Sequence, residues 1–172
     1  MPGEYAAASV KIQYENGGGG SGTVVYYDSS QRAALVLTNR HVASPNRKMA
    51  VLLPDGRGSG AQFLCYGPDG TDLAAIAVTA DETWPILPVA ASDEKTKAGS
   101  KVWMAGYPGS MGRKQTGRLG YYRGQRGRDD WYTMYCSGGD SGSGIISEDG
   151  KLVGVLWGGD AGNHYSTLAV PL

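Results

Sequence analysis

A serine at position 141 lies between glycines in the run Gly139-Asp140-Ser141-Gly142, and an apolar stretch begins shortly afterwards at Ile145. A serine hydroxyl is a weak nucleophile that needs a base to remove its proton and backbone N–H groups to stabilise the oxyanion. The flanking glycines let the backbone turn sharply, so the N–H groups of Gly139 and Ser141 could face one point. Alone, the run is equally compatible with a surface turn, because Gly, Ser and Asp are frequent turn residues.

Two other stretches supply the groups that would activate Ser141. The strand-like run from Leu35 ends in His41, and Asp72 opens a second apolar run that ends at Val78. The order His, Asp, Ser is that of the chymotrypsin-type triad and differs from the subtilisin and α/β-hydrolase orders. In such a triad His41 is the general base, and Asp72 holds its tautomer and stabilises the imidazolium.

The blocks Thr38–Val42, Asp72–Ala74 and Gly139–Gly142 resemble the three signature blocks of the trypsin-like (chymotrypsin-fold) serine proteases. Their short separations are similar to those of the compact HtrA-like and viral branches, and the resemblance covers nearly the whole chain. It implies a serine endopeptidase that binds a protein or peptide in extended conformation. It implies no metal and no cofactor.

Two of the three triad positions, Asp72 and Ser141, have competitors nearby. Asp69 precedes Asp72 but lies in a Pro-Asp-Gly turn, whereas the apolar run after Asp72 can anchor that residue. Ser137 and Ser143 flank Ser141, yet only Ser141 lies within Gly-Asp-Ser-Gly. The sequence therefore favours His41, Asp72 and Ser141 as catalytic residues, with the backbone of Gly139 and Ser141 as the oxyanion hole.

Short apolar runs separated by glycine-rich turns predict an all-β protein of two six-stranded antiparallel barrels, with the active site in the cleft between them. No segment has a helical period, and residues 17–20 read as a flexible loop. We expect an N-terminal barrel over 1–84 with His41 and Asp72, a connection over 85–98, and a C-terminal barrel over 99–172 with Ser141. The expected strands are 7–14, 21–27, 32–38, 49–53, 62–66, 73–78, 101–107, 115–123, 130–135, 144–147, 152–157 and 165–170.

The resemblance also implies a pocket for the substrate side chain before the scissile bond. Its floor would be Tyr135, beside Cys136, and the absence of a floor aspartate gives no support to a preference for Lys or Arg. His164 would form one wall as a ligand for an acidic or amide side chain, although a surface-loop histidine is the favoured interpretation. The strand that pairs with the substrate backbone would be Leu156, Trp157 and Gly158.

Asp140 departs from the pattern of the digestive relatives, in which a freed apolar N-terminus pairs with the aspartate before the nucleophile. No Ile-Val-Gly-Gly start is present in this sequence. Either Asp140 has another partner, or something else orders residues 136–141. Whether an activating partner is needed is left open.

Residues 113–128 hold six basic side chains and no acid until Asp129, with Tyr121 and Tyr122 among them. Aromatic and basic residues interleaved in this way can bind nucleic acid or an acidic substrate. A solvated hairpin on the rim of the second barrel is the favoured interpretation. The 16 basic and 16 acidic residues of the chain cancel, which argues against nucleic-acid and membrane partners.

The start of the chain lacks the basic and apolar regions of a secretory signal, and Cys65 and Cys136 have no zinc-like spacing. We read the cysteines as free thiols and expect a cytoplasmic protein. Two other functions stay open from the sequence: a catalytically silent peptide-binding module of the same fold, and an esterase that uses the same triad.

Overall fold

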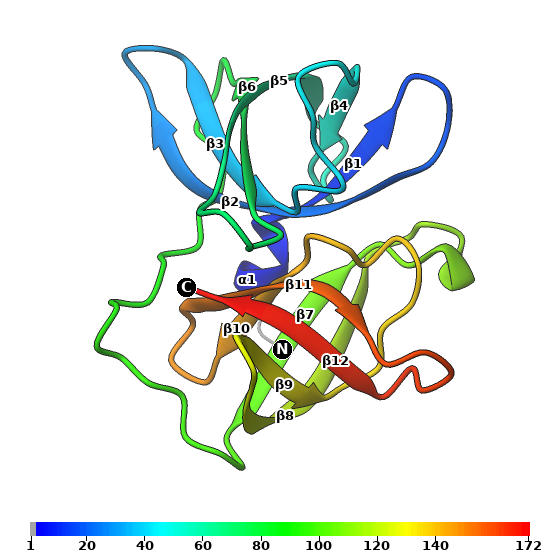
Figure 1. Cartoon of the computed structure of the whole chain (residues 1–172). Helices are drawn as coiled ribbons and strands as arrows, with labels where there is room; N and C mark the ends of the chain where they lie inside the picture. Colours follow the sequence, from blue (N-terminus) through cyan, green and yellow to red (C-terminus); the bar gives the residue numbers. More distant parts are fainter. Residues whose placement is uncertain (1–2) are drawn as a thin grey trace.

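The computed structural model describes residues 3–172 and shows two closed six-stranded barrels, one above the other (Figure 1). Their strand orders are β1-β2-β3-β6-β5-β4 and β10-β11-β12-β9-β8-β7, and every strand pairing is antiparallel. The all-β double barrel expected from the sequence is confirmed. The strands are β1 Ser9–Tyr14, β2 Gly19–Asp28, β3 Ala33–Thr38, β4 Met49–Leu52, β5 Gly58–Tyr66, β6 Ala74–Thr79, β7 Lys101–Gly106, β8 Thr116–Arg126, β9 Asp129–Thr133, β10 Gly144–Ser147, β11 Leu152–Gly159 and β12 Ser166–Pro171.

Each barrel is filled by the inward-facing residues of its strands. In β3, buried and half-buried residues alternate strictly, as the two-residue period of a strand requires. Val36 and Ile76 are fully buried in the first barrel, and Met104, Tyr132 and Ile145 are buried in the second. Two separate apolar cores result, one in each barrel.

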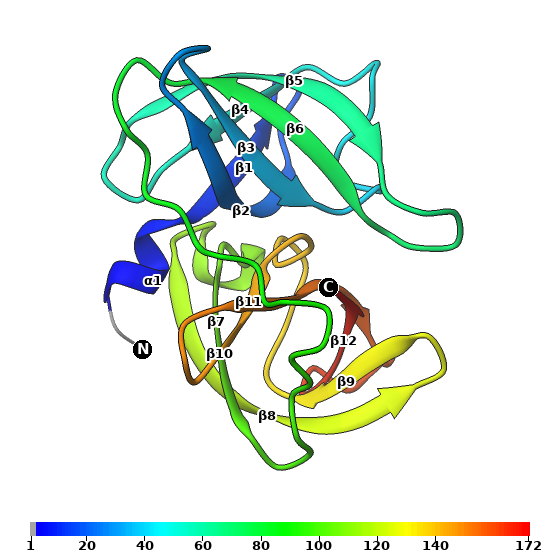
Figure 2. The ribbon, with the colours of Figure 1, turned by 90° about the vertical axis from the view of Figure 1, so that its left-hand side faces the viewer.

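A third apolar cluster joins the barrels and involves the connection between them. Leu87 packs with Ala8, Ile146 and Leu152, and its N–H donates to the carbonyl of Val24 at 2.9 Å. Trp84, three residues earlier, belongs to the core of the first barrel. Figure 2 shows this segment running along one side of both barrels. The connection is therefore anchored at Leu87 and Ala90, which are buried, while most of its other residues are exposed.

Two local features differ from the expectations. A short helix, α1, spans Gly3–Ala7, and a single 3-10 turn, η1, spans Gly109–Met111; neither is long enough to leave a helical period in the sequence. Gly19 and Gly20 belong to β2, so the expected flexible loop is shorter. No helix of the described residues 3–172 has the length and apolar character needed to span a membrane.

Candidate active site

His41 and Asp72 lie at the same edge of the first barrel because their strands are neighbours. Strand β3 ends at Thr38 and pairs with the start of β6, where Thr38 lies opposite Ala74. After β3 the chain turns, and the carbonyl of Asn39 accepts the N–H groups of Val42 and Ala43 at 3.1 Å each. This turn directs His41 toward the residues that precede β6.

Both carboxylate oxygens of Asp72 contact His41. Oδ2 lies 2.5 Å from Nδ1 of the ring, and Oδ1 accepts the backbone N–H of His41 at 3.0 Å. The Asn39 side chain in turn donates to the backbone carbonyl of Asp72 at 2.8 Å. A carboxylate at Nδ1 favours the tautomer with the proton on that atom, which leaves Nε2 as the basic nitrogen. The ring is half exposed and can reach a substrate.

Ser141 is held by its backbone between the two barrels. Its carbonyl accepts the N–H of Ser21 on β2 at 2.8 Å, and the N–H of Gly142 donates to Leu156 on β11, also at 2.8 Å. Gly142 has a φ of 91°, a left-handed conformation that favours glycine. The loop that carries Ser141 is therefore fixed against strands of both barrels.

Gly20 shows how close the two halves of the site lie. A Cβ atom at residue 20 would be 2.8 Å from the side chain of Val42 and 2.9 Å from the carbonyl of Ser141. The neighbour of His41 and the backbone of Ser141 thus pack against the same glycine. Within residues 3–172 no hydrogen bond joins the Ser141 hydroxyl to His41; such bonds are often long before a substrate binds.

The peptide groups around Gly139 are held by their carbonyl oxygens. Gly138 O accepts the N–H of Gly109 at 2.7 Å, and Gly139 O accepts the Ser21 hydroxyl at 2.8 Å and Arg113 Nη1 at 3.1 Å. The N–H groups of Gly139 and Ser141 bond to no acceptor within the described chain. Fixed N–H groups that point away from other acceptors have the character of an oxyanion hole.

Asp140 has a partner that the sequence did not suggest. Its side chain is fully buried, and both oxygens bind the guanidinium of Arg118 on β8, at 2.5 and 2.6 Å. The N–H of Ser137 also donates to Asp140 Oδ2 at 2.9 Å. Of the two options for Asp140, the structure therefore shows an internal partner.

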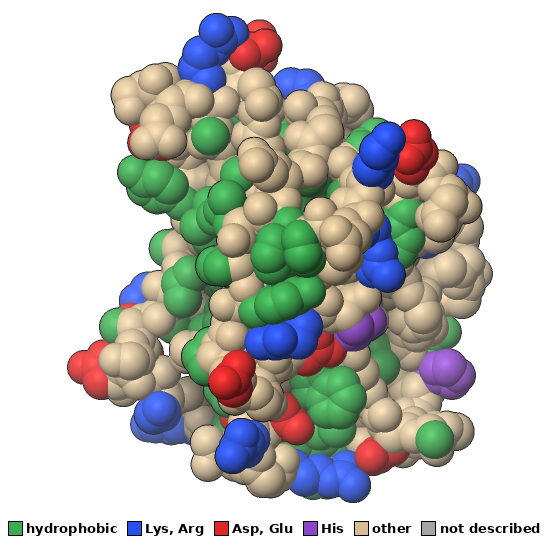
Figure 3. Space-filling model, turned by 45° about the horizontal axis from the view of Figure 1, so that its top comes forward, with side chains coloured by type: hydrophobic (Ala, Val, Ile, Leu, Met, Phe, Trp, Pro, Cys, Tyr) green, Lys and Arg blue, Asp and Glu red, His purple; other side chains and the backbone are tan. Residues whose placement is uncertain are grey.

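A pocket of about 250 Å³ opens beside Ser141. Four of the expected pocket residues line it: Cys136, Leu156, Gly158 and His164. His164 Nδ1 lies 2.9 Å from the Cys136 carbonyl, which fixes the imidazole ring against the wall. Burial raises the pKa of the Cys136 thiol, which keeps it protonated and a poor nucleophile. Figure 3 shows both histidine side chains of the chain on one face of the molecule.

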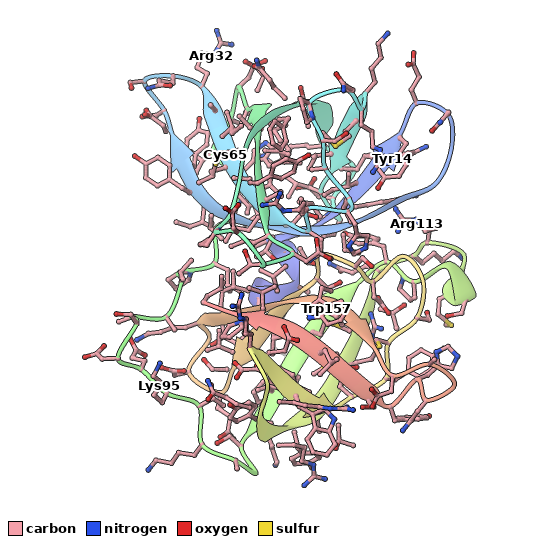
Figure 4. The ribbon with its side chains drawn as sticks, viewed as in Figure 1. Tyr14, Arg32, Cys65, Lys95, Arg113 and Trp157 are labelled. Carbon is pink, nitrogen blue, oxygen red and sulfur yellow. The ribbon has the colours of Figure 1, made fainter. Side chains whose placement is uncertain are left out.

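Two expected pocket residues lie outside this lining. The Trp157 indole donates to Asp129 Oδ1 at 3.0 Å, a bond within the second barrel, where Figure 4 shows the residue. The Tyr135 ring packs 5.7 Å from the His164 ring and backs the wall rather than lining the pocket. Residues not expected from the sequence line it as well: Ser137, Gly138, Gly159, Asp160 and Asn163.

The chain matches the family model of the trypsin-like peptidase domain over residues 20–155, most of its length. The chain belongs to the trypsin-like peptidase family. Its fold is that of the serine proteases of this family, with which it shares the double barrel.

More distant comparisons agree with this family. The chain is 25% identical over 157 residues to glutamyl endopeptidases of Staphylococcus epidermidis. The aligned region covers 78% of this chain and 54% of the relatives' chains. It therefore spans about half the length of these curated relatives. A serine endoprotease of Yersinia pestis superposes with a TM-score of 0.80 at 22% identity, covering 98% of this chain and 61% of the other.

A second solved structure has the same fold. It is an inactive serine-to-alanine mutant of a Mycobacterium tuberculosis H37Rv protein, with a TM-score of 0.76, 23% identity, and coverage of 98% of this chain and 83% of the other. At these identities the structural likeness establishes the fold of this trypsin-like peptidase domain and not its specificity.

The basic run of this peptidase domain leads into the β8–β9 hairpin, and four of its six basic residues are exposed, as the favoured interpretation expects: Lys114, Arg123, Arg126 and Arg128. The other two, Arg113 and Arg118, turn inward. Arg118 is buried against Asp140, and Arg113 donates to four backbone carbonyls. Arg126 Nη1 donates to both carboxylate oxygens of Asp160 at 3.0 and 2.8 Å, which lowers the pKa of that carboxyl, and this pair lies at the surface. Only Arg113 and Arg118 are bonded to internal partners. Spacing alone could not reveal this, because the partners come from distant parts of the chain.

Proposed function

We propose that the chain is a serine endopeptidase in which Ser141 is the nucleophile, His41 the general base and Asp72 its orienting carboxylate. The observation that carries the proposal is the bonded His41–Asp72 pair, together with Gly20, against which both Val42, the neighbour of His41, and the Ser141 carbonyl pack. Membership of the trypsin-like peptidase family supports the same reaction.

The reaction follows from these positions. Ser141 Oγ attacks the peptide carbonyl carbon while His41 Nε2 takes its proton, and the oxyanion accepts the N–H groups of Gly139 and Ser141. The C–N bond then breaks as His41 returns the proton to the amine. A water molecule, deprotonated by His41, attacks the resulting ester and releases the acid with Ser141 restored.

An extended peptide fits beside β11. Strand β10 begins at Gly144, opposite Val155, and the residues just before it bond to Leu156, so β11 beyond Leu156 has no β10 neighbour on that side. A substrate strand would use these free backbone groups by β-augmentation. The pocket beside Ser141 would then receive the side chain that precedes the scissile bond.

We further propose that this pocket prefers an acidic or amide side chain. His164 offers a polar ring in its wall, and Ser137 and Asn163 add polar groups. Asp160 also lines the pocket, but Arg126 balances its charge, so it attracts Lys or Arg weakly. The match to glutamyl endopeptidases supports this preference. Peptides that differ only in Glu, Gln, Lys or Leu at this position test it; faster cleavage after Lys would contradict it.

Fluorophosphonate labelling tests the reaction itself. We expect the wild-type chain to be labelled and to cleave a peptide, and the Ser141→Ala and His41→Ala variants to do neither. Ser30→Ala, an exposed serine in the β2–β3 turn, is the matched control and should label like wild type. Peptide binding by a folded, unlabelled wild type would instead indicate a silent binding module. Ester hydrolysis without peptide cleavage would indicate an esterase.

A further inference from the structure

A second pocket opens beside the oxyanion loop, residues 136–141. Its volume is about 330 Å³, and Gly138 and Gly139 of the loop form part of its wall. Gly138 also lines the pocket beside Ser141, so the two pockets meet at that residue. Most of the remaining wall comes from the first barrel, from strand β1 and the start of β2.

Only three of the residues that line this second pocket have side chains, and two of the three are cations. Lys11 and Gln13 lie on the outward face of β1, and Arg113 is the third; the other lining residues are glycines. No Asp or Glu of the described chain lines the pocket. Asp140, the acid of the oxyanion loop, is buried and already paired with Arg118. The pocket therefore has a positive character.

No carboxylate neutralises either cation. Arg113 donates to four backbone carbonyls, which are neutral, and Lys11 forms no ion pair within residues 3–172. The Arg113 guanidinium lies directly behind two glycines of the pocket wall. A Cβ at Gly19 would be 2.7 Å from its Nη2, and one at Gly139 would be 2.9 Å from its Nη1. A partly buried charge acts more strongly than one in water, so the pocket favours an anionic group.

The position of this pocket relates it to the part of the substrate that leaves. The scissile carbonyl would lie at the N–H groups of Gly139 and Ser141, with the preceding backbone along β11 and the preceding side chain in the pocket beside Ser141. Gly139 lines the second pocket and not the first, whereas Ser141 lines the first and not the second. A peptide that enters along β11 and passes Gly139 therefore continues toward β1.

We propose that the second pocket binds an acidic side chain of the substrate, at the first or second residue after the scissile bond. The proposal rests on the proposed function and adds a second specificity site to it. Lys11 is the specificity-determining residue, because its charge faces the pocket from the strand surface. Arg113 supplies the second charge but also bonds both barrels together, so Lys11 is the residue that can be changed without loosening the site.

Peptide cleavage tests the proposal with two series of substrates. All preceding residues stay fixed, and either the first or the second residue after the scissile bond is Glu, Gln or Lys. Each peptide ends in an amide, so the varied side chain is the only difference in charge. In one series we expect kcat/KM for Glu to exceed that for Gln about threefold and that for Lys about tenfold. The differences should shrink in 1 M salt, where the Debye length is about 3 Å.

Two variants of Lys11 connect the preference to this pocket. Lys11→Glu should abolish the preference for Glu over Lys, because the added negative charge cancels that of Arg113, and Lys11→Gln should reduce it. Cleavage of the Gln peptide should change little in either variant. Lys95→Glu alters the net charge by the same amount, but Figure 4 shows Lys95 on the other side of the molecule from Arg113. This control should keep the wild-type preference.

The outcomes separate this proposal from the proposed function. Equal cleavage of the Glu and Lys peptides in both series, or a preference that Lys11→Glu retains, overturns the proposal and leaves the endopeptidase intact. If the wild type cleaves no peptide, the proposed function fails, and fluorescence anisotropy then measures binding of the same peptides. Tighter binding of a Glu peptide, lost in Lys11→Glu and kept in Lys95→Glu, still supports the pocket. A chain that neither cleaves nor binds any of the peptides overturns both proposals.

Discussion

Asp72 illustrates how one residue can orient a catalytic group. It contacts His41 twice, through the ring at Oδ2 and through the backbone N–H at Oδ1. The second bond places the aspartate relative to the chain, and the first selects the ring tautomer. Its own backbone is held by Asn39, two residues before His41, so the pair is supported from both sides.

Asp72→Asn should lower kcat about 10³- to 10⁴-fold and leave KM nearly unchanged. An amide N–H facing Nδ1 favours the tautomer that carries the proton on Nε2, so the base is lost while the shape is kept. The measurement is steady-state peptide cleavage with fluorophosphonate labelling. Asp69→Asn, an exposed turn residue, is the control and should behave as wild type. Equal losses in both variants would contradict the role given to Asp72.

Asp130 carries a second charge within the second barrel, away from the triad. It is nearly buried and accepts the hydroxyl of Tyr122 at 2.9 Å. Burial raises the pKa of this carboxyl, and the hydrogen bond from Tyr122 offsets only part of the effect. The folded state therefore binds this proton more tightly than the unfolded state does. Its contribution to stability is present at low pH and is lost as the pH rises through the folded pKa.

Asp130→Asn should accordingly increase the free energy of unfolding at pH 7, since the amide oxygen can still accept the Tyr122 hydroxyl. The gain should disappear when the pH falls below about 3.9, where the unfolded carboxyl is also protonated. Urea denaturation at the two pH values measures this difference. Asp93→Asn, at an exposed position of the connection, should show no such pH dependence. If Asp130→Asn instead lowers the free energy of unfolding at pH 7, the predicted direction of the stability change is wrong.

At the scale of elements, Arg113 joins the paired strands β1 and β2 of the first barrel to two segments of the second barrel. Its guanidinium donates to Ile12 O at 2.7 Å, Gly20 O at 3.0 Å, Tyr107 O at 2.8 Å and Gly139 O at 3.1 Å. Figure 4 shows it at the junction between the barrels. Arg113 itself has a φ of 60°, an uncommon conformation for a non-glycine residue. This local cost is offset by four bonds that link β1 and β2 to Tyr107 and to Gly139, in the loop that carries Ser141.

Arg113→Met should lower the free energy of unfolding by about 2–4 kcal/mol, because partly buried carbonyls lose their donor. It should also slow peptide cleavage, since Gly139 O keeps only the bond from Ser21. Chemical denaturation and steady-state kinetics measure the two effects. Lys114→Met removes an exposed neighbouring charge and should change stability by less than about 0.5 kcal/mol. Similar effects of both substitutions would mean that Arg113 does not join the barrels.

At the scale of the whole molecule, the active site depends on how the barrels are fixed to each other. His41 and Asp72 belong to the first barrel, and Ser141 to the loop before β10 of the second. The apolar cluster around Leu87 and the bonds of Ser21 to the oxyanion loop bridge the two bodies. The distance between His41 and Ser141, the proposed base and nucleophile, therefore depends on the interface between the barrels.

Leu87→Ala tests this dependence. The side chain is buried in the cluster between the barrels, so its truncation should cost about 2–5 kcal/mol through lost burial and a cavity. We also expect a lower kcat in the molecules that stay folded. Peptide cleavage at low temperature measures the rate, and active-site labelling counts the folded molecules. Ile86→Ala, at the exposed neighbouring position, is the control. Loss of stability with an unchanged kcat would mean that the barrels keep their relative positions without this cluster.

Local patterns in the sequence were sufficient to predict the twelve strands, the double barrel and the candidate triad. Alternation of apolar residues sets which face of a strand is buried, and this signal is carried by neighbours such as Leu35, Val36 and Leu37. The blocks around His41, Asp72 and Ser141 are equally local. Each consists of a reactive side chain and the residues that turn or anchor the chain beside it.

Only the tertiary structure determined the partner of Asp140, the four bonds of Arg113 and the lining of the pocket. Ser21 and Gly139, which bond directly, are 118 residues apart in the sequence, and Arg113 and Ile12 are 101 apart. The sequence alone does not distinguish an arginine that is exposed to water from one that pairs with a buried carboxylate. Which one it meets is decided by barrel closure, which brings Arg118 on β8 against the loop before β10.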